Sequence, residues 1–208
     1  MNIKNLPKKI PIFPLSSAIF FPKTILPLNI FEKKYIQLVN DSMKSHRLFG
    51  MVQPKSRTEI YKVGCLGKIV SFNDTVDNRF AISLSGIVRF RIKEELTTKK
   101  LYREFVVDYS EFGDDLDSKK KIPEITDNTN LMNKIKIFFK KNDYLIEFNE
   151  LEKLNFDQMI STICMISPFS IEEKQKLVET VKIEDKIGIL QKIVNFNLAD
   201  NFESRTIQ

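Results

Sequence analysis

Few residues in this chain have the type and spacing that catalysis or metal binding requires. The lone histidine, His46, stands in the run Ser-His-Arg without a cysteine or carboxylate beside it, and a catalytic imidazole needs such a partner. The two cysteines, Cys65 and Cys164, lie far apart and form no Cys-x-x-Cys pair, so we expect buried free thiols. We therefore predict no catalytic residue, no metal site and no cofactor.

Two further patterns could suggest chemistry. Pairs of adjacent acidic residues occur at Glu94-Glu95, Asp114-Asp115 and Glu172-Glu173. Neighbouring side chains point apart or into solvent, so none of these pairs forms a general acid and base. Ser118 and Lys121 match Ser-x-x-Lys, but they lie in a charged run where nothing desolvates the lysine and lowers its pKa. We give this match no catalytic role.

The elements that would position a site fall into two groups. Residues 10–35 are apolar and contain four prolines, which exclude a helix and favour a sheet edge or a chain wrapped around a barrel. Asn29 followed by Glu32 predicts a helix start, with Phe31, Tyr35 and Leu38 on one face. Alternating Ile, Val and Phe predict strands over residues 10–13, 48–52, 63–72, 80–92 and 105–112.

The last third of the chain has helical periodicity. Apolar stripes run through Leu131, Ile135, Phe138 and Phe139, and through Phe156, Met159, Ile160, Ile163 and Cys164. We expect Asn155 to cap the second stripe, Ser170 and Glu173 to form a capping box, and residues 183–198 to form the last helix. Helical stripes of this kind are usually core, so we expect the helices to pack.

The formal charge of +6 is unevenly distributed along the chain. Residues 1–112 carry 19 basic against 10 acidic residues, whereas the remainder carries 14 against 17. A basic region can indicate a nucleic-acid surface, but these cations are scattered and interleaved with acids. In Arg89-Phe90-Arg91, strand alternation predicts an inward Phe90 and two outward arginines.

The order of short motifs in residues 10–112 resembles the N-terminal domain of Lon proteases. The family pattern is matched by Pro14-Leu15, Phe21-Pro22, Pro27-Leu28 and Phe31-Glu-x-x-Tyr35, then by a Val-Gly strand from Val63 and a Gly-x-x-Arg-Phe strand from Gly86. Lys33-Lys34 replaces the usual Pro-Arg before the tyrosine. The helical end, especially residues 167–175, resembles bacterial stand-alone members that lack the ATPase and peptidase domains.

This resemblance implies an α+β protein. A PUA-like, mostly antiparallel β-barrel with one short helix would occupy residues 1–113, a linker residues 114–130 and an α-helical bundle residues 131–208. No Gly-x-x-x-x-Gly-Lys-Ser/Thr motif occurs, because Lys62 stands where Gly67-Lys68 would need a glycine, and the family's Ser-Lys peptidase domain is missing. We therefore expect that the chain is not an enzyme.

The implied function is binding of unfolded or extended polypeptide, with a role as an adaptor for a separate protease in protein quality control. The alternative is RNA binding through the basic barrel. Three successive large apolar residues at positions 19–21 cannot all face one side of a strand, so we expect at least one to be exposed. The predicted apolar rim consists of Ile19, Phe20, Phe21, Pro22, Leu26, Ile30 and Phe31; the alternative is that these residues seat the loop on the core.

The sequence also bears on location. No apolar run approaches the roughly 20 residues of a membrane helix, and residues 1–9 are followed by proline-broken sequence rather than a signal-peptide core. We expect a cytoplasmic protein with no membrane partner. The sequence does not indicate an oligomeric state.

Overall fold

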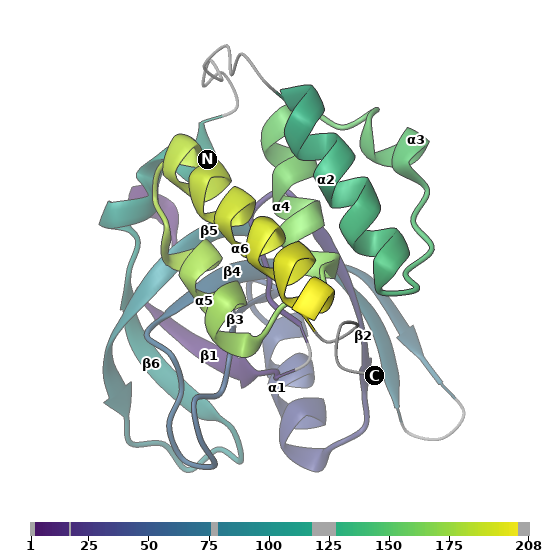
Figure 1. Ribbon diagram of the computed structural model, residues 1–208. Coiled ribbons are helices and arrows are strands. Elements are labelled where there is room, and N and C mark those ends of the chain that lie inside the picture. The colour runs from purple at the N-terminus through teal and green to yellow at the C-terminus, as the bar shows by residue number, and fades with distance from the viewer. Residues whose placement is uncertain (1–2, 17, 76–78, 118–127, 204–208) are drawn as a thin grey trace. The chain divides into compact units, whose positions relative to one another are not determined.

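The computed structural model describes residues 3–16, 18–75, 79–117 and 128–203 (Figure 1). The chain divides into two compact units, residues 1–120 and residues 121–208, which are described separately. In the described residues, no helix is long and apolar enough to cross a membrane.

The first unit is built on a six-stranded sheet in the order β2-β5-β4-β3-β1-β6. Strand β5 also pairs with β6, which closes the five strands other than β2 into a barrel. Only β1 and β3 run parallel; the other pairs are antiparallel. The strands span Lys9–Pro14 (β1), Ile25–Ile30 (β2), Leu48–Val52 (β3), Val63–Asp74 (β4), Phe80–Leu96 (β5) and Arg103–Asp108 (β6).

The proline-rich segment divides between these strands. Strand β1 is one of the five strands that form the closed barrel. In the described sheet, β2 pairs with β5 alone and is the terminal strand. Pro27 lies in β2, where an edge tolerates the missing backbone donor. The expectation of a sheet edge or a barrel wall is thus met by two different strands.

The first helix begins later than the sequence predicts. Helix α1 spans Lys33–Met43, and its N-cap is Glu32, whose side chain makes no capping hydrogen bond. Asn29 and Ile30 instead belong to β2, because six successive residues of β2 pair with β5 through Ile30. Phe31 therefore lies in the connection between strand and helix, and the predicted cap at Asn29 is wrong.

Strand β6 ends earlier than predicted. The chain leaves β6 at Asp108 and forms the short 3₁₀ helix η2 over Ser110–Leu116, with Phe112 completely buried. The start of the predicted linker, residues 114–116, thus belongs to η2 in the first unit. A second 3₁₀ helix, η1, spans Ile3–Asn5.

The second unit is helical, as predicted. Helix α6 contacts α2, α4 and α5, and the buried residues include the two predicted stripes apart from the half-buried Phe156. The helices span Asn128–Lys141 (α2), Phe148–Leu151 (α3), Phe156–Ile166 (α4), Ile171–Glu179 (α5) and Ile183–Glu203 (α6). The α+β fold class, a barrel followed by helices, is confirmed.

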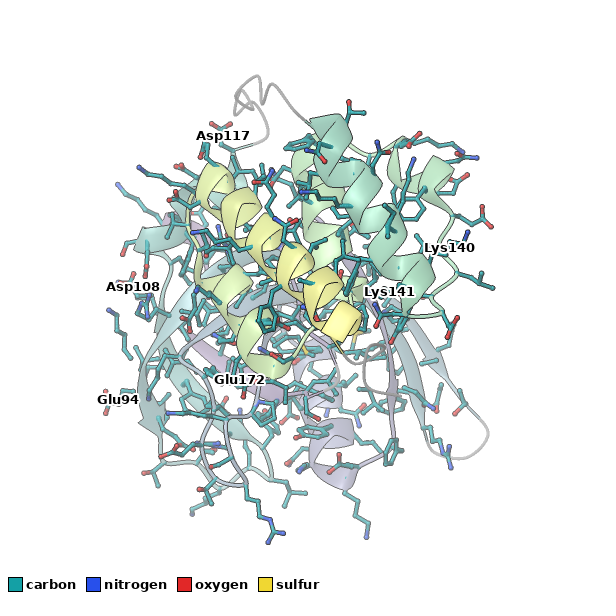
Figure 2. The ribbon with its side chains drawn as sticks, viewed as in Figure 1. Glu94, Asp108, Asp117, Lys140, Lys141 and Glu172 are labelled. Carbon is teal, nitrogen blue, oxygen red and sulfur yellow. The ribbon has the colours of Figure 1, made fainter. Side chains whose placement is uncertain are left out.

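Local signals set the helix ends in this unit. The Asn155 side chain accepts a hydrogen bond from the Gln158 backbone N–H, which confirms the predicted cap of α4. Ser170 and Glu173 form the predicted capping box of α5. Glu172 lies in the first turn of α5, while Lys140 and Lys141 end α2 (Figure 2). Both placements suit the helix dipole.

Candidate functional site

The loop from Ile19 to Pro22 belongs to the core of the first unit. Ile19, Phe20 and Phe21 are each at most 3% exposed, and Pro22 is also buried. The expectation that one of the three large residues would be exposed is therefore wrong. In a strand, alternation would expose at least one of the three side chains. This segment is instead a loop between β1 and β2, so all three side chains can turn inward.

Backbone geometry explains how the loop reaches the core. Lys23 adopts a left-handed conformation with φ 62°, and the Thr24 hydroxyl donates a 2.7 Å hydrogen bond to the Phe21 carbonyl oxygen. The Lys23 backbone N–H donates to the Gly86 carbonyl on β5. A Cβ at Gly86 would lie 2.0 Å from the Phe21 carbonyl oxygen, so only glycine permits this approach.

The other three residues of the predicted rim lie on or beside β2. Leu26 and Ile30 are buried, and they alternate with the exposed Ile25, Pro27 and Asn29 along the strand. Phe31 is 63% exposed and is thus the one member of the predicted rim that presents its ring to solvent. An exposed phenylalanine on a well-packed frame can supply apolar area to a ligand.

Phe31 borders a hollow that we call the apolar groove. It has a volume of about 340 Å³, and of its lining residues only Glu32 carries a charge. The Phe13 and Tyr35 rings stack within it at a centroid distance of 4.1 Å. It is lined by Phe13, Pro14, Leu15, Ala18, Leu26, Pro27, Leu28, Asn29, Ile30, Phe31, Glu32 and Tyr35.

The groove adjoins the free edge of β2. The Gly86 backbone N–H donates to the Thr24 carbonyl, so antiparallel alternation turns the backbone groups of Leu26, Leu28 and Ile30 toward β5. The groups of Ile25, Pro27 and Asn29 then face away from β5. Pro27 has no N–H, so an added strand would find carbonyl acceptors there but an interrupted row of donors.

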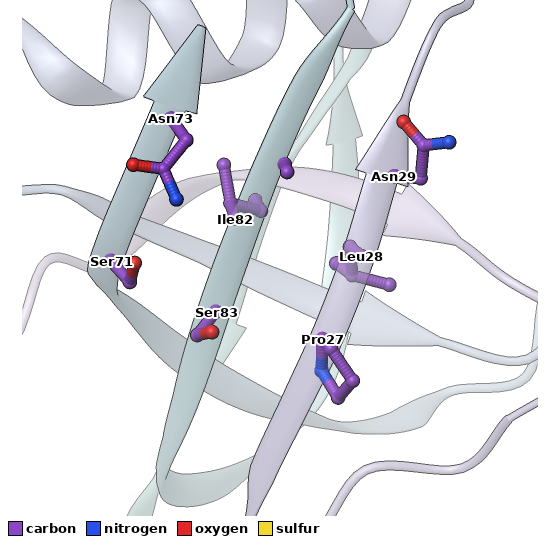
Figure 3. A pocket seen from close by; sticks show the side chains of 8 residues that line it. Pro27, Leu28, Asn29, Ser71, Asn73, Ile82 and Ser83 are labelled. Carbon is purple, nitrogen blue, oxygen red and sulfur yellow. The ribbon is translucent and has the colours of Figure 1, made fainter. Parts of the chain in front are cut away.

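A second hollow lies beside the first, on the sheet (Figure 3). It has a volume of about 390 Å³ and includes no charged residue in its lining. Pairing places Pro27, Ser83 and Ser71 in one row across β2, β5 and β4, and Asn29, Ala81 and Asn73 in the next. We call this the polar hollow; Leu28 and Ile82 complete its lining.

A third hollow of about 230 Å³ carries acidic and basic groups that already pair with one another. The Tyr102 hydroxyl donates to Asp41 at 2.9 Å, and Lys100 binds Glu104 at 2.8 Å. Burial raises the pKa of Tyr102 to about 12, so its hydroxyl stays protonated as a donor at neutral pH. The Tyr102 bond links the β5–β6 connection to α1, and the two pairs engage Asp41, Lys100 and Glu104, while Lys9 and His46 also line the hollow.

The cations of the Gly-x-x-Arg-Phe strand are also paired. Arg89 is 3% exposed and binds Asp115 through two side-chain hydrogen bonds of 2.9 and 2.7 Å, while its guanidinium lies over the Phe112 ring. Arg91 binds Glu111 in the same two-pronged way. Lys93 lies 3.5 Å from Asp108, which is labelled in Figure 2.

The prediction of two outward arginines did not foresee that η2 covers Arg89, whereas Arg91 is partly exposed. Strand alternation alone could not reveal the cover. Three acids follow β5 in the sequence: Asp108 at the end of β6, and Glu111 and Asp115 in η2. They are the sequence signal that could have indicated this cover. The guanidinium groups most suggestive of nucleic-acid binding are engaged within the protein.

The structure also places the histidine and the two cysteines considered for chemistry. His46 is exposed, and Cys65 and Cys164 are buried free thiols as expected; burial raises the pKa of Cys164 to about 12. Ser118 and Lys121 lie outside the described residues. Among the described residues, no group of three His, Cys, Asp or Glu side chains could hold a metal ion.

Comparison with known families gives one consistent result. A family model described as the ATP-dependent protease La (LON) substrate-binding domain matches residues 9–195. The Lon protease of Dictyoglomus thermophilum is 26% identical over 206 residues, which cover 93% of this chain and 24% of that protein. The Lon protease of Syntrophus aciditrophicus is 25% identical over 211 residues, covering 95% and 26%. The chain thus spans about a quarter of the length of these relatives.

Solved structures show the same fold. The Lon N-terminal domain protein from Xanthomonas campestris superposes with a TM-score of 0.63 at 18% identity, covering 88% of this chain and 96% of that one. The N-terminal domain of the Mycobacterium avium complex Lon protease gives a TM-score of 0.59 at 12% identity, covering 90% and 98%.

Proposed function

The chain belongs to the family of the ATP-dependent protease La (LON) substrate-binding domain, and on this premise we propose that it is a non-catalytic module that binds unfolded or extended polypeptide. Family membership supplies the class of function. The apolar groove supplies a place for it on this particular chain.

The observation that carries the proposal is the exposed ring of Phe31 at the border of that groove. Apolar side chains are sequestered in folded proteins and accessible in unfolded ones, so an apolar groove distinguishes the two states. The stacked rings of Phe13 and Tyr35 give the groove a firm wall, which limits the entropy lost on binding. The free carbonyls of β2 add acceptors for a peptide backbone.

We further propose that the bound polypeptide is passed to a separate protease, so that the chain acts as an adaptor in protein quality control. The adaptor role would appear as faster degradation of an unfolded substrate when the chain is added to its protease.

The test of polypeptide binding is the variant Phe31→Ser, measured by fluorescence anisotropy with labelled unfolded peptides. Loss of one buried phenylalanine contact should weaken binding roughly ten- to hundredfold, since burial of such a ring is worth about 1.5–3 kcal/mol. Leu101→Ser is the matched control, because Leu101 is also 63% exposed in the first unit but does not line the groove.

Salt separates this proposal from RNA binding. The groove lining has one charge, so peptide affinity should change little between about 50 and 200 mM salt, whereas affinity through phosphate contacts would fall steeply. Equal affinity of Phe31→Ser and the unaltered protein would remove the groove from consideration. Salt-sensitive RNA binding without peptide binding would replace the proposal by its alternative.

A further inference from the structure

The apolar groove and the polar hollow share one strand. Pro27, Leu28 and Asn29 of β2 line both. A ligand that fills the groove therefore has, directly across β2, a second concave surface of similar size. Each has the dimensions of a small-ligand site, for which about 300–1,000 Å³ is typical.

The polar hollow has side chains available for hydrogen bonding. Ser71, Asn73 and Ser83 make no side-chain hydrogen bond within the described part of the chain. Figure 3 shows Ser71 and Ser83 in one row on neighbouring strands, and Asn73 in the next row. Ala81, the residue between Asn29 and Asn73, leaves room for a ligand to approach the strand backbone.

The chemistry of these groups selects the ligand. Amide and hydroxyl groups both donate and accept hydrogen bonds, as peptide groups and the side chains of Ser, Asn and Gln do. None of the described residues that line the two concavities is a cation, but Lys34 pairs with Glu32 and lies over the Tyr35 ring beside the groove. A phosphate-bearing chain would have to compete with Glu32 for Lys34, whereas an uncharged polypeptide would find matching partners.

We propose that the polar hollow is a second subsite for the same polypeptide, so that the preferred ligand is an extended segment with a large apolar residue followed or preceded by uncharged polar residues. This inference rests on the proposed function of the apolar groove. The apolar residue occupies the groove, the segment crosses β2, and its backbone and polar side chains bind Ser71, Asn73 and Ser83. The subsite gives polypeptides of mixed composition an advantage over purely apolar ones.

The test compares two labelled peptides on the full chain. One is a short anchor peptide with a central phenylalanine and leucine; the other carries the same anchor with a Ser, Asn and Gln extension at each end. The extended peptide should bind roughly tenfold more tightly, which corresponds to one or two net hydrogen bonds.

Two variants remove the second subsite in different ways. The double variant Ser71→Ala with Asn73→Ala removes hydrogen-bonding groups and preserves the concavity, while Ser83→Tyr fills it. Both should abolish the advantage of the extended peptide and leave anchor binding unchanged. Asn40→Tyr, an exposed position on α1 that lines neither concavity, controls for a new surface tyrosine. Thermal unfolding checks that each variant is folded.

The outcomes are distinct. Loss of the advantage in both folded variants, with anchor binding intact, supports the second subsite. An extended peptide that binds unaltered protein no better than the anchor, or an advantage that survives both variants, overturns the subsite and leaves the proposed function standing. If neither peptide binds the unaltered protein, both proposals fail.

Discussion

The two halves of β5, before and after Gly86, differ in what their side chains contact. In the first half, Ala81 and Ser83 face the open polar hollow, and Ser85 follows in the next row. In the second half, three cations bind acids that lie at the end of β6 and in η2. The pairs are Arg89 with Asp115, Arg91 with Glu111 and Lys93 with Asp108. A register shift between the β5 residues Gly86 and Val88 marks the boundary.

The difference shows that the net charge of this unit does not by itself indicate a ligand surface. The basic half of β5 is occupied by the acidic segment that contains η2, so its cations stabilise the fold. The small uncharged side chains of Ala81 and Ser83, in the other half, are half-buried and border the polar hollow. A binding surface is therefore better sought where polar groups lack internal partners than where charge is densest.

The strongest test of this contrast is Arg89→Met. Removing one partner of a buried, doubly hydrogen-bonded ion pair leaves Asp115 without its guanidinium and should cost about 3–5 kcal/mol of unfolding free energy. Urea denaturation measures the loss. The matched change in the open half, Ser83→Met, should alter stability by less than about 0.5 kcal/mol. Similar losses in the two variants would show that the halves do not differ in this way.

A second variant locates the cause in the unpaired carboxylate. Arg89→Met combined with Asp115→Leu should recover part of the loss, because no charge is stranded, although the backbone N–H of residue 89 loses its Asp115 acceptor. No recovery would assign the effect to that lost hydrogen bond and to the contact of the guanidinium with Phe112.

Gly86, at the boundary of the halves, gives the next largest effect. In Gly86→Ala, the new Cβ would lie 2.0 Å from the Phe21 carbonyl oxygen and 2.9 Å from its carbon, and backbone atoms cannot rotate away. We expect a loss of about 1–3 kcal/mol in urea denaturation, as for other overpacked sites. Gly188→Ala is the control, since nothing lies within 4 Å of its Cβ position on α6; it should be neutral or stabilising. An unaffected Gly86→Ala would mean that the loop can move at little cost.

The helices and strands are easier to predict from the sequence than the distant segments that pack over them. Alternation and capping residues predicted most strands of the barrel and the caps at Asn155 and Ser170, because these signals are local. The exposure of Phe20 or Arg89 depends on which distant segment packs over it, so a local pattern could not decide it. The strand Ile25–Ile30 was missed as a separate element because its proline weakens the strand pattern, and its pairing with β5 decides it.

The candidate site shows the same limit. Phe31 is one of the seven residues predicted to form the apolar rim, and it is the one with an exposed ring. Phe31 lies in the connection between β2 and α1, whereas a cap at Asn29 would have placed it inside the helix. The polar hollow depends on the registers of three strands and had no signal in the sequence.

The smallest effect concerns Arg91 and Glu111, whose side chains are 39% and 38% exposed. The hydrogen bonds from Arg91 lower the pKa of Glu111 from its usual 4.5. A carboxylate with a lowered folded-state pKa stabilises the fold above its unfolded pKa, and that contribution is lost as the pH falls through the folded-state value. Exposure to solvent limits it to below about 1 kcal/mol. Arg91→Met should therefore be less stable than the unaltered protein at pH 7, and the gap should close as the pH falls below 4.5 and through the lowered folded-state pKa of Glu111. Ser83→Met, which touches no titratable group of the hollow, should show a constant difference across this range. A gap for Arg91→Met that stays constant with pH would mean that the pair of Arg91 and Glu111 contributes through packing alone.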